Sequence, residues 1–149
     1  RFDMAQCAVV AMERLSSTFE QKGITPESDC AQMTVEADRG LIECAVNNFL
    51  ANAVNHAGGE KKIRISLRKS DAHIVLEVFN SGDAVPECEQ ERIWDVFYKS
   101  DEARSRQYGG HGLGLAIVRS IAERHGGRVG QKNIEGGVVF FMLIPATQN

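Results

Sequence analysis

Three asparagines between residues 48 and 55 have the spacing and side-chain chemistry of a cation site. Asn48, Asn52 and Asn55 lie at positions i, i+4 and i+7, so in a helix their amides share one face. Mg²⁺ takes oxygen ligands and retains several waters, so one or two amides and the phosphates of a nucleotide could complete its coordination. A solvated polar strip that ends in a helix-terminating asparagine is the alternative, and the motif alone leaves both open.

A second polar segment, NSGDA at residues 80–84, directly follows an expected strand. The Asn80 side chain, at the strand end, could hydrogen-bond a flat ligand, and Gly82 would let the backbone approach that ligand closely. Most segments of this kind are only turns, so by itself the pattern favours a turn.

Glycines dominate a third segment, GGHGLGL at residues 109–115, which opens an apolar helical pattern. Backbone N–H groups at a helix N-terminus attract anions, and glycines let that backbone wrap around phosphates. The segment does not follow a strand, so the dinucleotide-binding fingerprint does not fit, and the lysine-containing phosphate loop is absent as well. The pattern therefore indicates a phosphate site of another kind.

The elements that must position these segments follow from hydrophobic periodicity and from turn residues. Asp38 is a plausible N-cap for the asparagine-bearing helix. The expected helices are 5–20, with Val9 on its apolar face, 41–56, one opened by Pro86 that carries Ile93, Trp94 and Phe97, and 113–125. Trp94 and Phe97 are expected in the core, since an apolar pair at helical spacing usually packs inward. The expected strands are 34–37, the hairpin 62–80 and the closing hairpin 128–144, with a polar loop at 99–112. This mixture predicts a two-layer α+β sandwich, with a mixed, mostly antiparallel sheet packed against helices.

Composition limits the size and the partners of the chain. Its 149 residues, 43% of them hydrophobic, suffice for one domain with a single core. Acids and bases are interspersed and the net charge is −3, which argues against a nucleic-acid partner. The longest apolar runs, such as 138–145, are far shorter than the roughly 20 residues of a membrane helix. We therefore expect a soluble, cytoplasmic domain without membrane contact of its own.

The four cysteines are expected to be buried, reduced thiols. They are widely spaced, with no C-x-x-C pair and no histidine at ligand spacing, which argues against zinc and against a disulfide framework. They are Cys7, Cys30, Cys44 and Cys88.

Together, in this order and at these separations, the three segments resemble the N, G1 and G2 boxes of the histidine kinase catalytic domain. Residues 93–99 (IWDVFYK) resemble its F box. The resemblance covers almost the whole chain. It implies the Bergerat-type ATP-binding sandwich shared with gyrase, the Hsp90 chaperones and the mismatch-repair ATPases, with a lid at 99–112. It also implies that residues 1–149 are the catalytic domain alone, without the dimerisation domain that carries the phosphorylated histidine.

The resemblance also implies roles for individual residues. Asn52 would be the Mg²⁺ ligand, and Asn48 would lie beside the metal and phosphates. Asn80 would face the adenine amino group, Gly82 would pack under the base, and Lys99 could reach the γ-phosphate. The remaining nucleotide-contacting positions would be Asn55, His56, which would stack near the nucleotide, Ala84, Val85, and the segment Gly110, His111, Gly112, Leu113, Gly114 and Leu115, whose glycines would cradle the phosphates.

Asn48 separates the functions that the resemblance allows. The hydrolytic relatives carry a glutamate at this position, where it can act as a base, but an amide cannot accept a proton at neutral pH. Neutral imidazole is already a nucleophile, so transfer of the γ-phosphoryl group to a histidine needs no such base. We therefore expect a Mg-ATP-dependent histidine kinase domain. Its partners would be its own dimerisation domain and a response regulator receiver domain, at the inner face of a membrane that the parent sensor spans. The alternatives are a kinase-inactive nucleotide-binding module and an ATPase conformational switch.

Four positions depart from the family pattern. Asn80 stands where aspartate is usual, Ala84 where a second glycine is common, Asn55 where lysine is common, and His111 where threonine is common. Some sensor kinases of the vancomycin-resistance type also carry asparagine in the G1 box, so the change does not imply an inactive enzyme. An amide offers a donor as well as an acceptor, so we expect weaker discrimination for adenine than an aspartate would give.

Overall fold

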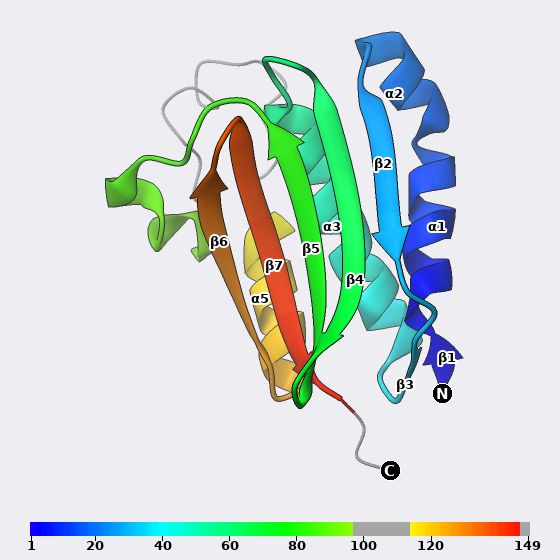
Figure 1. The fold of residues 1–149 in the computed structure, drawn as a ribbon. Helices are drawn as coiled ribbons and strands as arrows, with labels where there is room; N and C mark the ends of the chain where they lie inside the picture. The colour runs from blue at the N-terminus through cyan, green and yellow to red at the C-terminus, as the bar shows by residue number, and fades with distance from the viewer. Residues whose placement is uncertain (97–113, 147–149) are drawn as a thin grey trace.

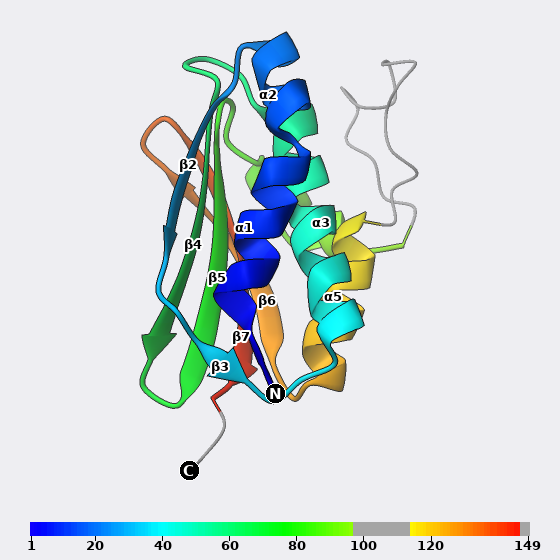
Figure 2. The same cartoon turned by 90° about the vertical axis from the view of Figure 1, so that its right-hand side faces the viewer.

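The computed structural model describes residues 1–96 and 114–146. It is a two-layer α+β sandwich, in which a five-stranded sheet forms one layer and α1, α3 and α5 form the other (Figure 1 and Figure 2). The predicted fold class is confirmed. The helices are α1 (Met4–Arg14), α2 (Ser16–Lys22), α3 (Arg39–His56) and α5 (Gly114–Arg124), and two 3₁₀ turns are η1 (Glu87–Glu89) and η2 (Arg92–Trp94). In the ranges that the structure describes, no helix has the length and hydropathy needed to cross a bilayer.

The large sheet has the strand order β2-β4-β5-β7-β6. Its strands are β2 (Thr25–Cys30), β4 (Lys62–Ser70), β5 (His73–Ser81), β6 (Arg128–Ile134) and β7 (Gly137–Pro145). Strand β2 runs parallel to β4, and every other pair of neighbours is antiparallel. The short strands β1 (Phe2–Asp3) and β3 (Thr34–Val35) pair with each other. Both predicted hairpins are confirmed.

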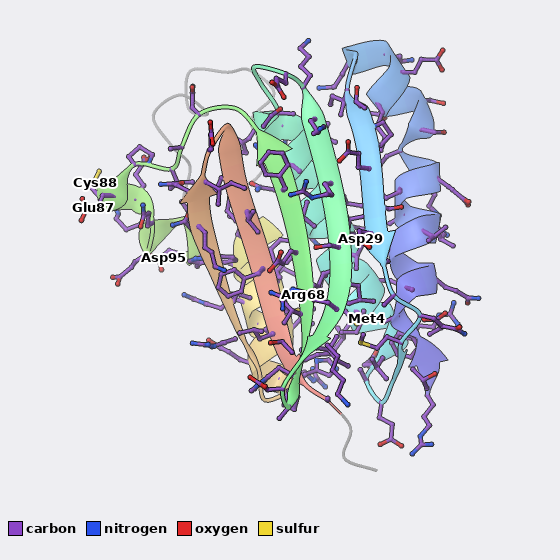
Figure 3. The ribbon with its side chains drawn as sticks, viewed as in Figure 1. Met4, Asp29, Arg68, Glu87, Cys88 and Asp95 are labelled. Carbon is purple, nitrogen blue, oxygen red and sulfur yellow. The ribbon has the colours of Figure 1, made fainter. Side chains whose placement is uncertain are left out.

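The alternation in β4 and β5 decides which face of the sheet meets the helices. Ile65 is opposite Val78 and Leu67 is opposite Leu76, so the buried apolar side chains of both strands face the same way. Arg68 lies on the opposite, open face, where its guanidinium is 3.0 Å from the Glu77 carboxylate (Figure 3). The sheet therefore buries one face under the helices and leaves the charged one outside.

Three aromatic rings join α3, η2 and β7 at the centre of the core. Phe49 lies 6.4 Å from Trp94 and 6.5 Å from Phe140, and Trp94 lies 6.1 Å from Phe140, measured between ring centroids. Two of the three pairs are edge-to-face, the arrangement that ring quadrupoles favour. Trp94 is thus a core residue, as predicted, and η2 is attached to the core through it.

The first predicted helix is wrong in one respect. Instead of one helix over 5–20, the chain forms α1 and α2, which meet at Leu15, where the Leu15 N–H bonds the Met12 carbonyl at 3.2 Å. The residues that follow, Ser-Ser-Thr, are poor helix formers because their hydroxyls compete for the backbone. Val9, expected on the core face, is 43% exposed, because the side chains of Ala8 and Ala11 occupy that face instead.

Two further expectations need correction, and both concern elements without clear periodicity. Strand β2 was not anticipated, because it is polar and contains Pro26, which an edge strand tolerates. The helix expected after Pro86 is replaced by the 3₁₀ turns η1 and η2, and Phe97 lies outside the described residues.

The cysteines are free, as predicted, but they are not all buried. Cys7 is buried, Cys30 and Cys44 are half-buried, and Cys88 is exposed on η1, which projects away from the sheet (Figure 3). Cys88 is exposed because η1 packs only lightly against the rest of the chain, with no buried residue of its own.

Replacing Phe49 tests whether the aromatic group holds α3 on the sheet. Phe49 is 1% exposed, so Phe49→Ala should lower the free energy of unfolding by about 3–5 kcal/mol. Urea denaturation followed by the fluorescence of Trp94, the single tryptophan, measures it. Val9→Ala, a deletion at an exposed position, should change stability by less than about 0.5 kcal/mol. Equal effects of the two substitutions would contradict this account of the core.

Candidate functional site

The helix that carries the asparagine ladder is fixed at its start by two side chains. Asp38 Oδ1 accepts from the Leu41 N–H at 3.1 Å, which confirms the predicted N-cap. His125, just after α5, accepts from the Asp38 N–H through Nε2 at 3.2 Å, while its Nδ1 lies 2.8 Å from the Ile121 carbonyl oxygen. His125 therefore ties the beginning of α3 to the end of α5.

Asn48 lies where α3 meets the beginning of α5. Its Nδ2 donates to the Cys44 carbonyl at 2.8 Å, so the donor of this amide is used within the helix. A Cβ atom added to Gly114 would lie 3.3 Å from Asn48 Oδ1. The first residue of α5 thus packs directly on the asparagine, and a glycine permits that approach. The structure brings the first and third sequence motifs together at this point.

Asn52 lies one turn further along α3 and has an uncommitted amide. It is half-buried, and its Nδ2 is shielded from solvent without a hydrogen-bond partner among the described residues. A buried polar group without a partner costs stability, so such a group calls for an explanation such as a ligand. Asn55 and His56, at the end of the helix, are exposed.

The end of β5 packs against the end of α3 through Gly82. Gly82 has a φ of 131°, and a Cβ there would lie 3.0 Å from the His56 carbonyl oxygen and 3.1 Å from the Gly58 nitrogen. Only glycine accommodates both this conformation and this contact. The second motif is therefore joined to the first at the carboxyl end of the helix.

Ser81 joins the end of β5 to the residues after α3, a role that was not predicted from the sequence. Its Oγ donates to the Gly58 carbonyl at 2.7 Å and accepts from the Lys62 N–H at 2.7 Å. The Gly58 N–H in turn donates to the Ser81 carbonyl at 2.9 Å. Ser81 is 3% exposed, so these bonds lie inside the protein. A serine in a turn-like segment has no sequence signal that would reveal partners so far along the chain.

Asn80 is the most buried polar residue of the described site, at 1% exposed. Its Nδ2 donates to the Ser81 carbonyl at 3.1 Å, whereas its Oδ1 has no partner among the described residues. One of the two N–H donors of the amide is therefore engaged, and its acceptor oxygen is open. An aspartate in the same place would also present an acceptor.

The other expected site residues divide between described and undescribed parts of the chain. Ala84 is exposed. Val85 and Leu115 are half-buried and pack on the core. Lys99, Gly110, His111, Gly112 and Leu113 lie outside the described residues.

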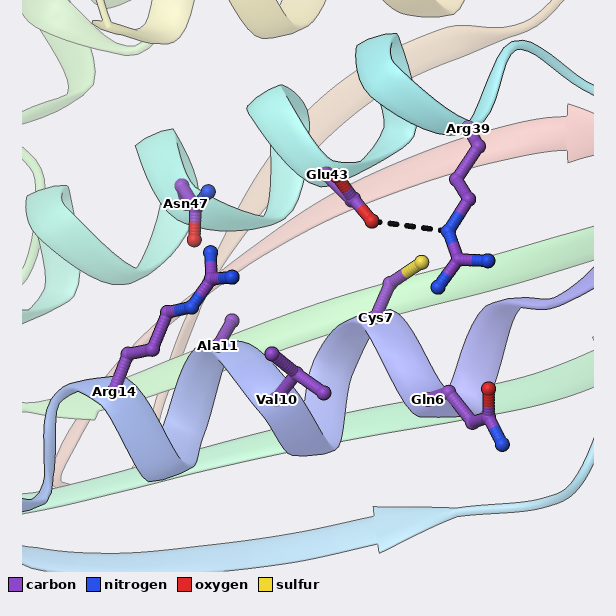
Figure 4. Close-up of a pocket in the computed structure, with 8 residues that line it drawn as sticks. All are labelled: Gln6, Cys7, Val10, Ala11, Arg14, Arg39, Glu43 and Asn47. Atoms are coloured by element: carbon purple, nitrogen blue, oxygen red, sulfur yellow. Dashed lines mark hydrogen bonds and ion pairs between the residues drawn. The ribbon is translucent and has the colours of Figure 1, made fainter.

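A small hollow lies between α1 and α3, but it contains none of the ladder residues (Figure 4). Within it, Arg39 Nε is 3.1 Å from the Glu43 carboxylate, and the Arg39 guanidinium lies over the Phe2 ring. Burial raises the pKa of the Cys7 thiol, and the Glu43 carboxylate adds to this effect. The raised pKa keeps the thiol protonated at neutral pH.

Comparison with known proteins decides the family. Residues 37–148 match the family described as histidine kinase-, DNA gyrase B- and HSP90-like ATPase. The chain belongs to this family. The matched region contains α3, the end of β5 and the start of α5, which are the elements that meet at the candidate site.

Individual relatives narrow the comparison to sensor kinases. The chain is 41% identical over 113 residues to the sensor protein CzcS of Cupriavidus metallidurans; the match covers 75% of this chain and 24% of that protein. The solved catalytic domain of histidine kinase ThkA has a TM-score of 0.86 at 28% identity, covering 99% of this chain and 97% of that one. A structure of ThkA in complex with response regulator protein TrrA gives a TM-score of 0.81 at 28% identity, covering 98% of this chain and 41% of that one. The fold of the ATPase domain is thus that of histidine kinase catalytic domains.

Gly82→Ala tests the close packing of the second motif on α3. An alanine there combines an unfavourable φ with close contacts to two backbone groups. Gly82→Ala should therefore lower the free energy of unfolding by about 1–3 kcal/mol more than the same substitution at a glycine that has only the unfavourable φ. The matched variant is Gly59→Ala, which has a φ of 57° but nothing within 4 Å of the added Cβ, and should cost only about 1–2 kcal/mol. Thermal or urea unfolding measures both, and equal losses would show that the contact at Gly82 is unimportant.

Proposed function

We propose that this domain binds Mg-ATP between α3 and the end of β5 and transfers the γ-phosphoryl group to a histidine of a dimerisation domain. The observation that supports this most directly is a pair of amide atoms, Asn52 Nδ2 and Asn80 Oδ1, that are buried without a hydrogen-bond partner among the described residues. They lie on the two elements that Gly82 brings into contact. A bound ATP would use both groups: Asn80 Oδ1 would accept from the adenine amino group, and the Asn52 amide would face the phosphates and their Mg²⁺.

Asn52 would hold Mg²⁺ through its Oδ1, and its unpartnered Nδ2 could donate to a phosphate oxygen. Magnesium prefers oxygen ligands and keeps several waters, so a single neutral amide together with nucleotide phosphates suits it. Bound there, the ion would neutralise charge on the phosphates. Asn48 would act beside it, and Lys99 and the glycines at 110, 112 and 114 would hold the phosphates.

The chemistry of Asn48 favours transfer to imidazole over hydrolysis. In the proposed transfer, an imidazole nitrogen forms a bond to the γ-phosphorus while the bond to the β–γ bridging oxygen breaks, leaving ADP. Neutral imidazole needs no base for this attack, whereas water does. Asn48 cannot accept a proton, and its Nδ2 already donates to the Cys44 carbonyl. The site therefore offers a phosphoryl donor without activating water.

We further propose that the phosphoryl group passes from the histidine to an aspartate of a response regulator. ThkA, which shares this fold, forms a complex with a response regulator. The chain spans only 24% of the length of CzcS, so the acceptor histidine would lie in another part of the parent sensor, with this domain at the inner face of its membrane. A kinase-inactive nucleotide module and an ATPase switch remain the competing functions, which the transfer experiment separates.

Nucleotide binding and phosphotransfer test the proposal together. The domain should bind ATP with micromolar-to-millimolar affinity, roughly 4–8 kcal/mol, and more tightly with Mg²⁺ than without. Asn52→Ala should abolish the difference between the affinities with and without Mg²⁺.

With radioactive ATP, the domain should label an added histidine-bearing domain of its parent but not itself. Binding without transfer would indicate the inactive module, and release of inorganic phosphate without a labelled acceptor would indicate the switch. Equal Mg²⁺ dependence in wild type and Asn52→Ala would exclude Asn52 as the ligand.

The orientation of Asn80 leads to a separate prediction about the base. Because the Ser81 carbonyl engages one N–H of Nδ2 and leaves Oδ1 buried without a partner, the open acceptor should select the adenine amino group, which argues against the loose base selection expected from the sequence. Asn80→Leu, of similar shape, should weaken ATP binding by about 1–3 kcal/mol while leaving GTP binding nearly unchanged. Asn80→Asp keeps an acceptor and should maintain or widen the preference for ATP. Competition binding gives the ratios, and an unchanged ratio in Asn80→Leu would mean that Asn80 does not read the base.

A further inference from the structure

One side chain fastens the segment after β5 to the edge strand β6. The Val85 N–H donates to Asn133 Oδ1 at 3.0 Å, and Asn133 Nδ2 donates to the Val85 carbonyl at 2.9 Å. Asn133 lies near the end of β6, 48 residues further along the chain. A single amide thus pairs with both backbone groups of Val85, as the backbone of a neighbouring strand residue would.

The segment 82–86 makes few other hydrogen bonds, and Val85 also packs on the edge of the core. It leaves the end of β5 and passes the turn between β6 and β7 on its way to η1 (Figure 1). At its start, the Gly82 N–H donates to the Gly136 carbonyl at 3.0 Å. The Val85 carbonyl accepts a second, longer bond from Gln90 Nε2 at 3.3 Å. Among the described residues, the Val85 N–H has Asn133 as its one acceptor.

We infer that Asn133 is a positioning residue of the nucleotide site. It would hold residues 82–86 where Ala84 and Val85 can line the adenine end of the ligand. This inference rests on the proposed ATP site, and it assigns a role to a residue outside every motif of the sequence. If the segment is free to leave this position, only a fraction of molecules is ready to bind, and the apparent affinity falls by that fraction.

The position of Asn133 makes the inference testable without unfolding the protein. Asn133 is exposed, so removing its side chain leaves no cavity in the core. Asn133 is not itself a candidate nucleotide-contacting position, and its effect would reach the nucleotide only through Val85. Glu135, exposed in the turn that follows β6, provides a matched control on the same hairpin.

Asn133→Ala should weaken binding of both ATP and ADP by roughly three- to tenfold. Because the change acts at the adenine end, the factor should be the same for both nucleotides and the same with and without Mg²⁺. Calorimetric titration of wild type, Asn133→Ala and Glu135→Gln measures these factors. Hydrogen exchange of the Val85 amide should become faster in Asn133→Ala and stay slow in Glu135→Gln.

A second variant and the wild type separate the possible outcomes. Asn133→Asp has the same size, but it places a carboxylate oxygen against the Val85 carbonyl, so it should lose at least as much affinity as Asn133→Ala. Binding of both variants as tight as that of Glu135→Gln would overturn the inference while leaving the proposed function intact. A loss confined to Mg-ATP and absent for ADP would overturn it as well, since the effect would then lie at the phosphates. Absence of ATP binding in the wild type would instead contradict the proposed function itself.

Discussion

The packing of one face of α3 against the sheet is the interaction on which the rest of the structure depends. Ile42, Val46, Phe49 and Ala53 are fully or almost fully buried along this helix, and Phe49 meets the rings of Trp94 and Phe140. Burial of this kind fixes both the rotation and the axial position of a helix. Asn48 and Asn52 flank Phe49 at the border of the buried face, so the apolar contacts determine where their amides lie.

Both ends of α3 are then tied to the other site-bearing elements. At its start, the Asp38 N–H donates to the ring of His125, which follows α5. At its end, Gly82 and Ser81 of the β5 end contact Gly58. These bonds are short-range and specific, unlike the hydrophobic packing, which is roughly proportional to area. As a result, α3, the end of β5 and α5, which are far apart in the sequence, are held next to one another.

The amides at the site illustrate how a neutral side chain can replace a carboxylate. Asn80 has its donor engaged by the Ser81 carbonyl, so it presents an acceptor, which is also what an aspartate offers. Asn48 is an amide and cannot accept a proton at neutral pH, and its Nδ2 bond to the Cys44 carbonyl fixes how the side chain lies. At Asn48 the residue type thus limits the chemistry, whereas at Asn80 the hydrogen bond of the amide nitrogen determines which group faces the site.

The sequence by itself determined the two-layer class, the N-cap at Asp38, both hairpins and the three motifs, because periodicity and capping act over a few residues. It misplaced Val9 and the helix after Pro86, and it missed β2, since edge strands and 3₁₀ turns follow tertiary contacts more than local preference. Only the tertiary structure decided the orientation of the Asn80 amide, the role of Ser81 and the pairing of Asn133 with Val85. Each depends on where a hydrogen-bonding partner lies in space, and in the last case that partner is 48 residues away along the chain. The residues next to a side chain in the sequence do not specify such a partner, so only the folded structure shows it.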